Sequence, residues 1–128
     1  LVMLDLDGLK VINVTSGHAM GDIALRELVA RSQACLGRAD LIGRLGGDEF
    51  AILLPAADET KARAIVQAIR ERLAASPAPD LGRAVSASFG IATTADMPAS
   101  LSQLLQAADQ AMYVEKRARR KPGGAPPA

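Results

Sequence analysis

Two adjacent glycines, Gly46 and Gly47, lie between the apolar runs 41–44 and 50–54, and this feature most constrains the fold. Glycine adopts the unusual φ values that a tight turn requires, and apolar runs on either side of such a turn are typical of paired strands. The sequence therefore predicts a β-hairpin, and with it an antiparallel sheet. Asp48 and Glu49 follow the glycines, so we expect carboxylates at the hairpin tip.

The other apolar segments predict strands and helices that pack on this sheet. Residues 1–6 read as a buried strand, and the alternation in 85–91 predicts a half-buried strand. Apolar residues recur at helical spacing in three further segments. We expect helices from Asp22 to about Leu36, after the capping residue Asp58, and after the capping box of Ser100 and Gln103. This order predicts an α+β sandwich with helices over a mostly antiparallel sheet.

An apolar fraction of 49% over 128 residues is sufficient for one domain with one core. The chain has two Phe, one Tyr and no Trp, and its net charge is +1, so we expect no nucleic-acid partner.

In the last helix Met112 and Tyr113 are assigned to the core. The residues of that helix expected to face inward are Leu101, Leu104, Leu105, Ala108 and Met112.

The ends of the chain and its cysteine content bear on location. No apolar run approaches the roughly 20 residues of a membrane span, so we expect no membrane contact by this domain. Cys35, the one cysteine, is predicted to be buried and excludes an internal disulfide, which suits a reducing cytoplasm. The opening run is interpreted as a strand entered midway, in a trimmed piece of a longer protein. We assign 1–121 to one domain and 122–128 to a disordered Gly/Pro-rich tail.

Acidic residues cluster in two places that the predicted sheet can bring together. Asp5 and Asp7 lie on the same side of the first strand, and Asp48 lies at the hairpin turn. Converging carboxylates repel one another unless a divalent cation lies between them, and Mg²⁺ commonly shares its ligand sphere with nucleotide phosphates. The pattern therefore predicts a metal–phosphate site, although either acidic pair alone is also typical of a solvated strand end or turn.

The segment Gly46-Gly47-Asp48-Glu49-Phe50 is the signature of the GGDEF family, and its companions are present in order. The resemblance covers roughly residues 1–121. The companion segments are 4–13, Gly17-His18, Gly21-Asp22, 88–92, Ala108-Asp109, Met112-Tyr113 and Lys116.

Membership of this family implies a palm-like (ferredoxin-like) sandwich and diguanylate cyclase activity. Two GTP molecules would be joined into cyclic di-GMP with release of two pyrophosphates, across a homodimer of such domains. The resemblance also implies two Mg²⁺ or Mn²⁺ ions per active site, a cytoplasmic location, and an N-terminal sensory or dimerising domain in the parent protein, which is expected to be membrane-anchored in some cases.

The resemblance also implies the candidate site residues. Metal ions would be held by Asp5, the Leu6 carbonyl, Asp48 and Glu49, with Asp48 and Glu49 as the catalytic pair and Glu49 as ligand or base. Guanine would be read by Asn13 and Asp22. Phosphates would be bound by Gly8, Leu9, Lys10, Lys116 and Arg120.

Several of these positions also have simpler interpretations. Asp22 would serve as a helix N-cap, and the basic residues 116–121 would form a solvated helix end favoured by the helix dipole. The sequence also departs from the family pattern, since Val14 stands where an aspartate is usual, and Arg119 where a glycine is usual. The family's inhibitory Arg-x-x-Asp motif is reduced to Asp40 alone, and we expect weak or no product binding there. The family's leading helix is absent.

Two other functions remain open at this stage. The chain would be a catalytically weak domain that binds GTP as a regulatory module, which Val14 and the altered C-terminal motif favour. Alternatively, it would be a plain α+β interaction domain, which leaves the converging acids unexplained.

Overall fold

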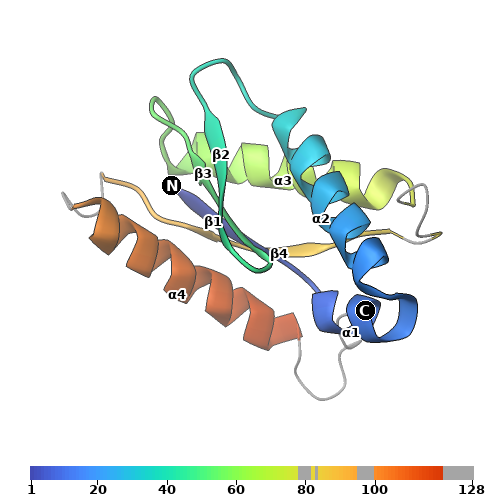
Figure 1. The fold of residues 1–128 in the computed structure, drawn as a ribbon. Helices are drawn as coiled ribbons and strands as arrows, with labels where there is room; N and C mark the ends of the chain where they lie inside the picture. The colour runs from blue at the N-terminus through green and yellow to red at the C-terminus, as the bar shows by residue number, and fades with distance from the viewer. Residues whose placement is uncertain (78–81, 83, 95–99, 120–128) are drawn as a thin grey trace.

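The computed structural model describes residues 1–77, 82, 84–94 and 100–119. Within this part of the chain, strands and helices are interspersed along the sequence (Figure 1). The elements are β1 (Val2–Leu6), α1 (Leu9–Ser16), α2 (His18–Gln33), β2 (Leu41–Gly46), β3 (Glu49–Leu53), α3 (Glu59–Ala75), β4 (Ala87–Ile91) and α4 (Leu101–Arg119).

The strands form one antiparallel sheet in the order β2-β3-β1-β4. The predicted hairpin is β2–β3, and its register is irregular between Arg44 and Gly46, beside the turn. β1 lies between β3 and β4, and all five of its residues are buried. The α+β architecture with an antiparallel sheet is therefore confirmed.

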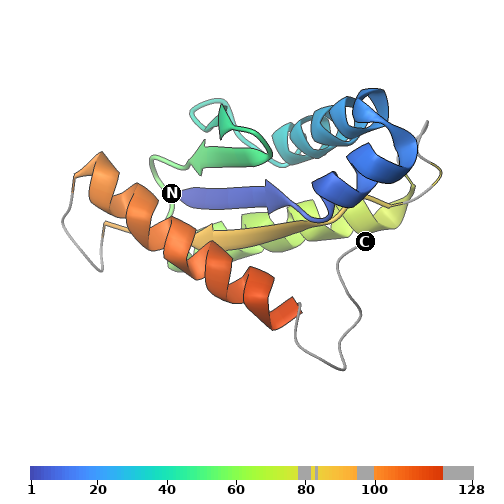
Figure 2. The same cartoon turned by 60° about the horizontal axis from the view of Figure 1, so that its bottom comes forward.

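Helices cover both faces of the sheet (Figure 2). On one face α2 and α3 pack against the main core, whose largest fully buried side chains include Leu4, Leu28, Ile52 and Ile69. On the other face α4 packs over β1 and β4, with Met3 in contact with it. This arrangement leaves the C-terminal end of β1 between α1 and α4, where the acidic residues lie.

The capping signals predicted at the starts of α3 and α4 are confirmed. The Asp58 side chain accepts a hydrogen bond from the Lys61 amide at 2.8 Å. The Ser100 amide donates to Gln103 Oε1 at 3.1 Å and the Gln103 amide donates to Ser100 Oγ at 3.3 Å, which is the reciprocal capping box.

The N-terminal helices differ from the prediction. Residues 9–16 form the helix α1, which the sequence did not indicate, and Gly17 at φ 90° separates it from α2. α2 begins at His18 and ends at Gln33, so the predicted start at Asp22 was wrong. Gly17 is the N-cap residue, and Asp22 lies inside the helix, so the interpretation of Asp22 as a cap was also wrong.

Burial on the α4 side differs as well. β4 was predicted to be half-buried, but its residues Ala87–Gly90 are all buried because α4 covers the second face. Leu101 and Tyr113 were assigned to the inward face and the core, but they are 59% and 58% exposed. Met112 is buried as predicted, whereas Cys35 is only partly buried.

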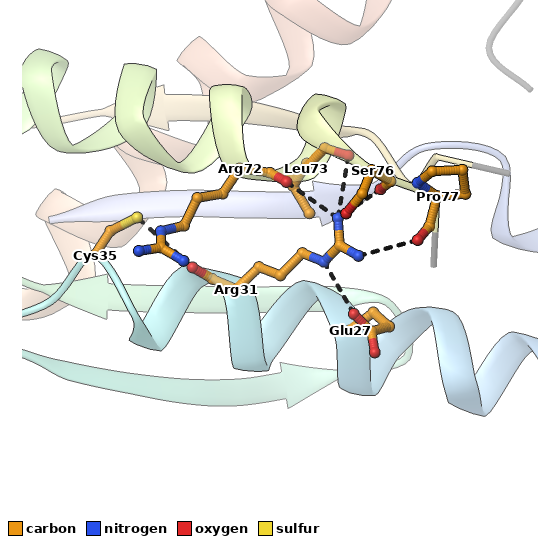
Figure 3. A network of polar contacts seen from close by, with 7 residues as sticks. All are labelled: Glu27, Arg31, Cys35, Arg72, Leu73, Ser76 and Pro77. Carbon is orange, nitrogen blue, oxygen red and sulfur yellow. Dashed lines mark hydrogen bonds and ion pairs between the residues drawn. The ribbon is translucent and has the colours of Figure 1, made fainter. Parts of the chain in front are cut away.

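A polar junction joins α2 to the end of α3, and Arg31 is its centre (Figure 3). Its Nη1 donates to the carbonyl oxygens of Arg72 at 3.0 Å and Ser76 at 2.8 Å, and Nη2 donates to the Pro77 carbonyl at 3.3 Å. Its Nε donates to Glu27 Oε2 at 2.9 Å. Arg31 therefore satisfies carbonyl groups that the last turn of α3 leaves without helical partners.

None of the helices in the described part of the chain combines the length and the apolar character that crossing a membrane requires. Residues 122–128, predicted to form a disordered tail, lie outside the described residues.

Candidate active site

The end of β1 brings the predicted acidic residues together. Asp5 pairs with Glu49 of β3 on one side and with Ser88 of β4 on the other. The Leu6 amide donates to the Asp48 carbonyl oxygen at 3.2 Å, so the hairpin turn lies beside the end of β1. The expected convergence of Asp5 with Asp48 is therefore observed, and strand pairing is its cause.

Asp5 is a buried carboxylate that is only partly satisfied. Its Oδ2 accepts a hydrogen bond from Lys116 Nζ at 2.8 Å, while Oδ1 is buried and has no hydrogen-bond partner among the described residues. Burial raises the pKa of Asp5 to about 7, the nearby Asp48 carboxylate adds to the rise, and Lys116 opposes it. The negative charge of these carboxylates is therefore only partly neutralised by Lys116, and a further cation would neutralise the rest.

The donor set fits a divalent cation that is shared with a ligand. No group of three His, Cys, Asp or Glu side chains within the described ranges is placed to hold a metal by itself. Mg²⁺, however, is usually bound by one or two carboxylates together with nucleotide phosphates and water, not by a cage of protein side chains. Asp5, with its unsatisfied Oδ1, and Asp48 supply that number of carboxylates.

Asp7, the second acid of the first cluster, contacts β4. It is 4% exposed, and it accepts hydrogen bonds from Ser86 Oγ at 3.0 Å and Ser88 Oγ at 2.7 Å. Its amide also donates to the Ser86 carbonyl oxygen at 2.9 Å. Asp7 therefore ties the chain that leaves β1 to β4, immediately before the turn at Gly8.

A cavity of about 470 Å³ opens between α1 and the hairpin turn. Gly8, at φ 71°, is the N-cap residue of α1, and no side chain caps the amides of its first turn. Uncapped amides at a helix N-terminus attract anions. The cavity is lined by Leu9, Lys10, Asn13, Val14, His18, Gly47 and Asp48.

Asn13 and Asp22 lie on two neighbouring helices. Asn13 packs so closely on Gly21 that an added Cβ there would collide with its Oδ1. Asp22, the next residue, lines a second cavity of about 480 Å³ together with Arg26, Arg44 and Phe50. The two predicted guanine readers therefore lie on packed helices, but they line different cavities.

A protein-family model described as the diguanylate cyclase GGDEF domain matches residues 1–122. This chain belongs to the GGDEF family.

Relatives and solved structures agree with this assignment. The chain is 38% identical over 118 residues to the probable diguanylate cyclase DgcE of Escherichia coli (strain K12), and 40% identical over 123 residues to the diguanylate cyclase TpbB of Pseudomonas aeruginosa (strain UCBPP-PA14). Both matches cover 91% of this chain but only 11% and 28% of those proteins, so the chain spans a small part of their length.

Two solved structures show the same fold. The active GGEEF domain of a diguanylate cyclase from Vibrio cholerae has a TM-score of 0.80 at 28% identity, covering 91% of this chain and 75% of that one. The GGDEF domain of TpbB from Pseudomonas aeruginosa has a TM-score of 0.79 at 36% identity, covering 91% and 74%.

The other site residues predicted for this GGDEF domain have contacts that differ from the predicted ones or are not described. Lys116, expected at the phosphates, lies at the site but is paired with Asp5. Arg120, the other predicted phosphate ligand, lies outside the described residues. Asp40, the remnant of the inhibitory motif, accepts a hydrogen bond from the Gly37 amide at 2.7 Å and so closes its own loop.

Two contacts in this GGDEF domain were missed at the level of sequence. The Arg44 guanidinium donates to the Gly47 carbonyl oxygen at 2.9 Å and braces the signature turn. An arginine two residues before a glycine pair is a usable signal for such a brace. Glu115, next to Lys116, bonds to α3 and β4, and no local pattern indicates contacts so distant in the sequence.

Proposed function

We propose that this GGDEF domain is the catalytic domain of a diguanylate cyclase, which joins two molecules of GTP into cyclic di-GMP and releases two pyrophosphates. The observation that carries the proposal is Asp5, whose buried Oδ1 has no partner among the described residues and which lies beside Asp48 and Glu49. Relatives named diguanylate cyclases support it.

The first role of the chain's own residues is to hold the nucleotide. Asn13 and Asp22 would bind guanine: an aspartate accepts hydrogen bonds from both N1–H and the 2-amino group, and adenine cannot supply that pair of donors. The amides at Gly8 and Leu9, together with Lys10, would bind the phosphates at the start of α1.

Asp5, the Leu6 carbonyl, Asp48 and Glu49 would hold one or two Mg²⁺ or Mn²⁺ ions. When bound, such ions lower the pKa of the attacking hydroxyl and stabilise charge that develops on the phosphate. When cation and nucleotide bind, the Lys116 ammonium would leave the Asp5 carboxylate and bind the terminal phosphates instead. The exchange is favourable because Asp5 would then be neutralised by the cation, and the phosphates are anionic like the carboxylate that they replace.

The reaction needs two such domains. The 3′-oxygen of one GTP forms a bond to the α-phosphorus of the other, the bond to the leaving pyrophosphate breaks, and the hydroxyl proton passes to Glu49 acting as base. A second, reciprocal transfer closes the ring. One domain holds one GTP, so a homodimer would supply the orientation of the two nucleotides.

The test is product formation from GTP and Mg²⁺, resolved by chromatography, with the chain fused to a coiled-coil dimeriser. We expect cyclic di-GMP from the fused protein and none from Asp48→Ala, with circular dichroism unchanged. Arg63→Ala, which removes an exposed ion pair with Glu59 on α3, is the matched control and should keep full activity. GTP binding without any product would refute the cyclase proposal and support the regulatory module instead.

A further inference from the structure

α4 brings Lys116 to the candidate active site, and its contact with the sheet is close but narrow. Gly90 of β4 lies against the α4 backbone, where an added Cβ would collide with the Ala108 carbonyl oxygen and the Met112 amide nitrogen. Three buried apolar side chains complete this contact, Met3, Ala108 and Met112, and the residues packed partly buried against them are mostly small or at the edge: Leu1, Ala51, Ala92 and Leu105. Because apolar contacts are non-directional, they fix the distance of the helix from the strand more firmly than its rotation about its own axis.

Glu115 supplies directional contacts on this helix. Its carboxylate oxygens accept hydrogen bonds from Arg70 Nη2 at 2.8 and 2.7 Å, and Oε1 also accepts from the Phe89 amide at 3.2 Å. Arg70 belongs to α3 and lies over the Phe89 ring, with 4.6 Å from Cζ to the ring centroid. β4 is an edge strand, so Glu115 fastens α4 both to the open edge of the sheet and to α3.

The next residue along the helix is Lys116, whose side chain is 16% exposed and whose Nζ lies 2.8 Å from Asp5 Oδ2. Successive side chains on a helix are about 100° apart, so a single rotation of α4 sets the directions of both Glu115 and Lys116. A side chain extends roughly 6 Å from the helix axis, so a rotation of about 20° moves its end by roughly 2 Å. That displacement is enough to break a hydrogen bond.

We infer that Glu115 is a positioning residue for Lys116: by fixing the rotation of α4 against β4 and α3, it holds the Lys116 ammonium at the active site. Its consequence for nucleotide binding rests on the proposed function, because Lys116 would bind the terminal phosphates of GTP. Glu115 acts through Lys116 and is not itself a catalytic residue.

The first experiment uses the nucleotide-free chain and tests the positioning alone. The Lys116 ammonium, hydrogen-bonded and largely shielded, should give a ¹⁵N–¹H signal protected from exchange with water, assigned by its loss in Lys116→Arg. Glu115→Ala should abolish this signal, and Glu115→Gln, which keeps an oxygen acceptor, should retain part of it. Arg63→Ala should leave it intact. Persistence of the signal in Glu115→Ala would overturn the inference.

Arg70→Met serves as a second variant in case Glu115→Ala does not fold. It keeps an aliphatic chain over Phe89 and removes the two hydrogen bonds from Arg70 to Glu115, while the one from the Phe89 amide remains, so it should weaken the protection of the Lys116 signal. An unchanged signal in folded Arg70→Met would overturn the inference as well.

The second experiment measures affinity for GTP and for GMP by calorimetry in the presence of Mg²⁺. Glu115→Ala should weaken GTP binding by roughly five- to tenfold, the loss expected for one charge-assisted contact, and leave GMP binding unchanged. In a Lys116→Ala background the same substitution should have no further effect on GTP. Equal losses for GTP and GMP, or losses that add fully to that of Lys116→Ala, would overturn the inference. A wild-type chain that binds no GTP would refute the proposed function, and the ammonium signal would still decide the positioning.

Discussion

Arg31 should stabilise this domain far more than a typical surface arginine. Its side chain is 15% exposed and joins α2 to the C-terminal end of α3 (Figure 3). The shortest of its bonds to main-chain carbonyls are those to Ser76 at 2.8 Å and Arg72 at 3.0 Å. Arg31→Met keeps the aliphatic part of the side chain and removes every polar contact, so it isolates the value of the junction.

The expected loss can be worked from the contacts. A hydrogen bond from a charged donor contributes about 1.5–3 kcal/mol when shielded. Water can replace Arg31 at the exposed carbonyls, so we count about 1 kcal/mol for each of the two short bonds. A cation at a helix C-terminus adds about 0.5 kcal/mol, and the pair with Glu27 about 0.3 kcal/mol. Arg31→Met should therefore lower the free energy of unfolding by about 2–3 kcal/mol.

Urea denaturation followed by circular dichroism measures this loss. The midpoint should fall with little change in the slope, and the melting temperature should fall by about 10 °C for a domain of this size. Arg63→Met is the matched control, because its ion pair with Glu59 is exposed, and it should cost less than about 0.5 kcal/mol. If Arg31→Met costs no more than Arg63→Met, the reasoning that this junction joins α2 to α3 is wrong.

Three further predictions follow from buried groups and close approaches. Burial raises the pKa of Asp5 to about 7, so the folded state holds this proton more tightly than the unfolded chain, where the carboxyl ionises near pH ~4. Stability should therefore fall as pH rises through the window from about 4 to 7. Melting curves in EDTA should show Asp5→Asn more stable than wild type at about pH 8, with the difference shrinking toward about pH 5; the opposite trend would contradict the shift. Gly21→Ala should displace Asn13 and weaken GTP binding roughly tenfold in calorimetry, whereas Gly43→Ala, where an added Cβ meets nothing within 4 Å, should not. Equal affinities in the two variants would argue against guanine contact by Asn13. Gly90→Ala should destabilise the domain by about 3 kcal/mol in urea denaturation, because the new Cβ meets the α4 backbone; a loss below about 1 kcal/mol would mean that α4 moves away at little cost.

The parts of the fold that local chemistry determines could be predicted from the sequence. The glycine pair predicted the hairpin, and polar residues at helix starts predicted the caps. The helix α1 was missed because its sequence, Leu9–Ser16, is rich in β-branched residues and contains an asparagine, all of which are weak helix formers. Burial of Ile12 in the core and the glycines at its two ends make it helical, and these are tertiary effects.

The wrong predictions of which α4 side chains are buried have a related cause. The apolar spacing of α4 predicted a wide inward face, but the helix approaches β4 at Gly90, so only a narrow stripe touches the sheet. Leu101 and Tyr113 lie outside that stripe. Sequence periodicity gives the direction of an apolar face, whereas its width depends on the partner surface.

In the candidate site, too, some contacts follow from local sequence patterns and others depend on tertiary packing. Alternation along a strand and the position of the hairpin turn were enough to bring Asp5 and Asp48 together. The pairing of Lys116 with Asp5 joins residues 111 positions apart and depends on the placement of α4, which no local pattern describes. Family resemblance predicts Lys116 at the phosphates, and the structure adds that its ammonium is paired with the Asp5 carboxylate.

The central position of β1 has a consequence for the synthesis of this domain on the ribosome. β1 ends at Leu6 and needs β3 and β4 on its two sides, and β4 begins only at Ala87. At about 5–20 residues per second, roughly 80 residues of translation separate the strand from its last partner, an interval of about 4–16 s. During that time an apolar strand has an unpaired edge. Nascent chains should therefore need chaperone protection of β1 until β4 has emerged.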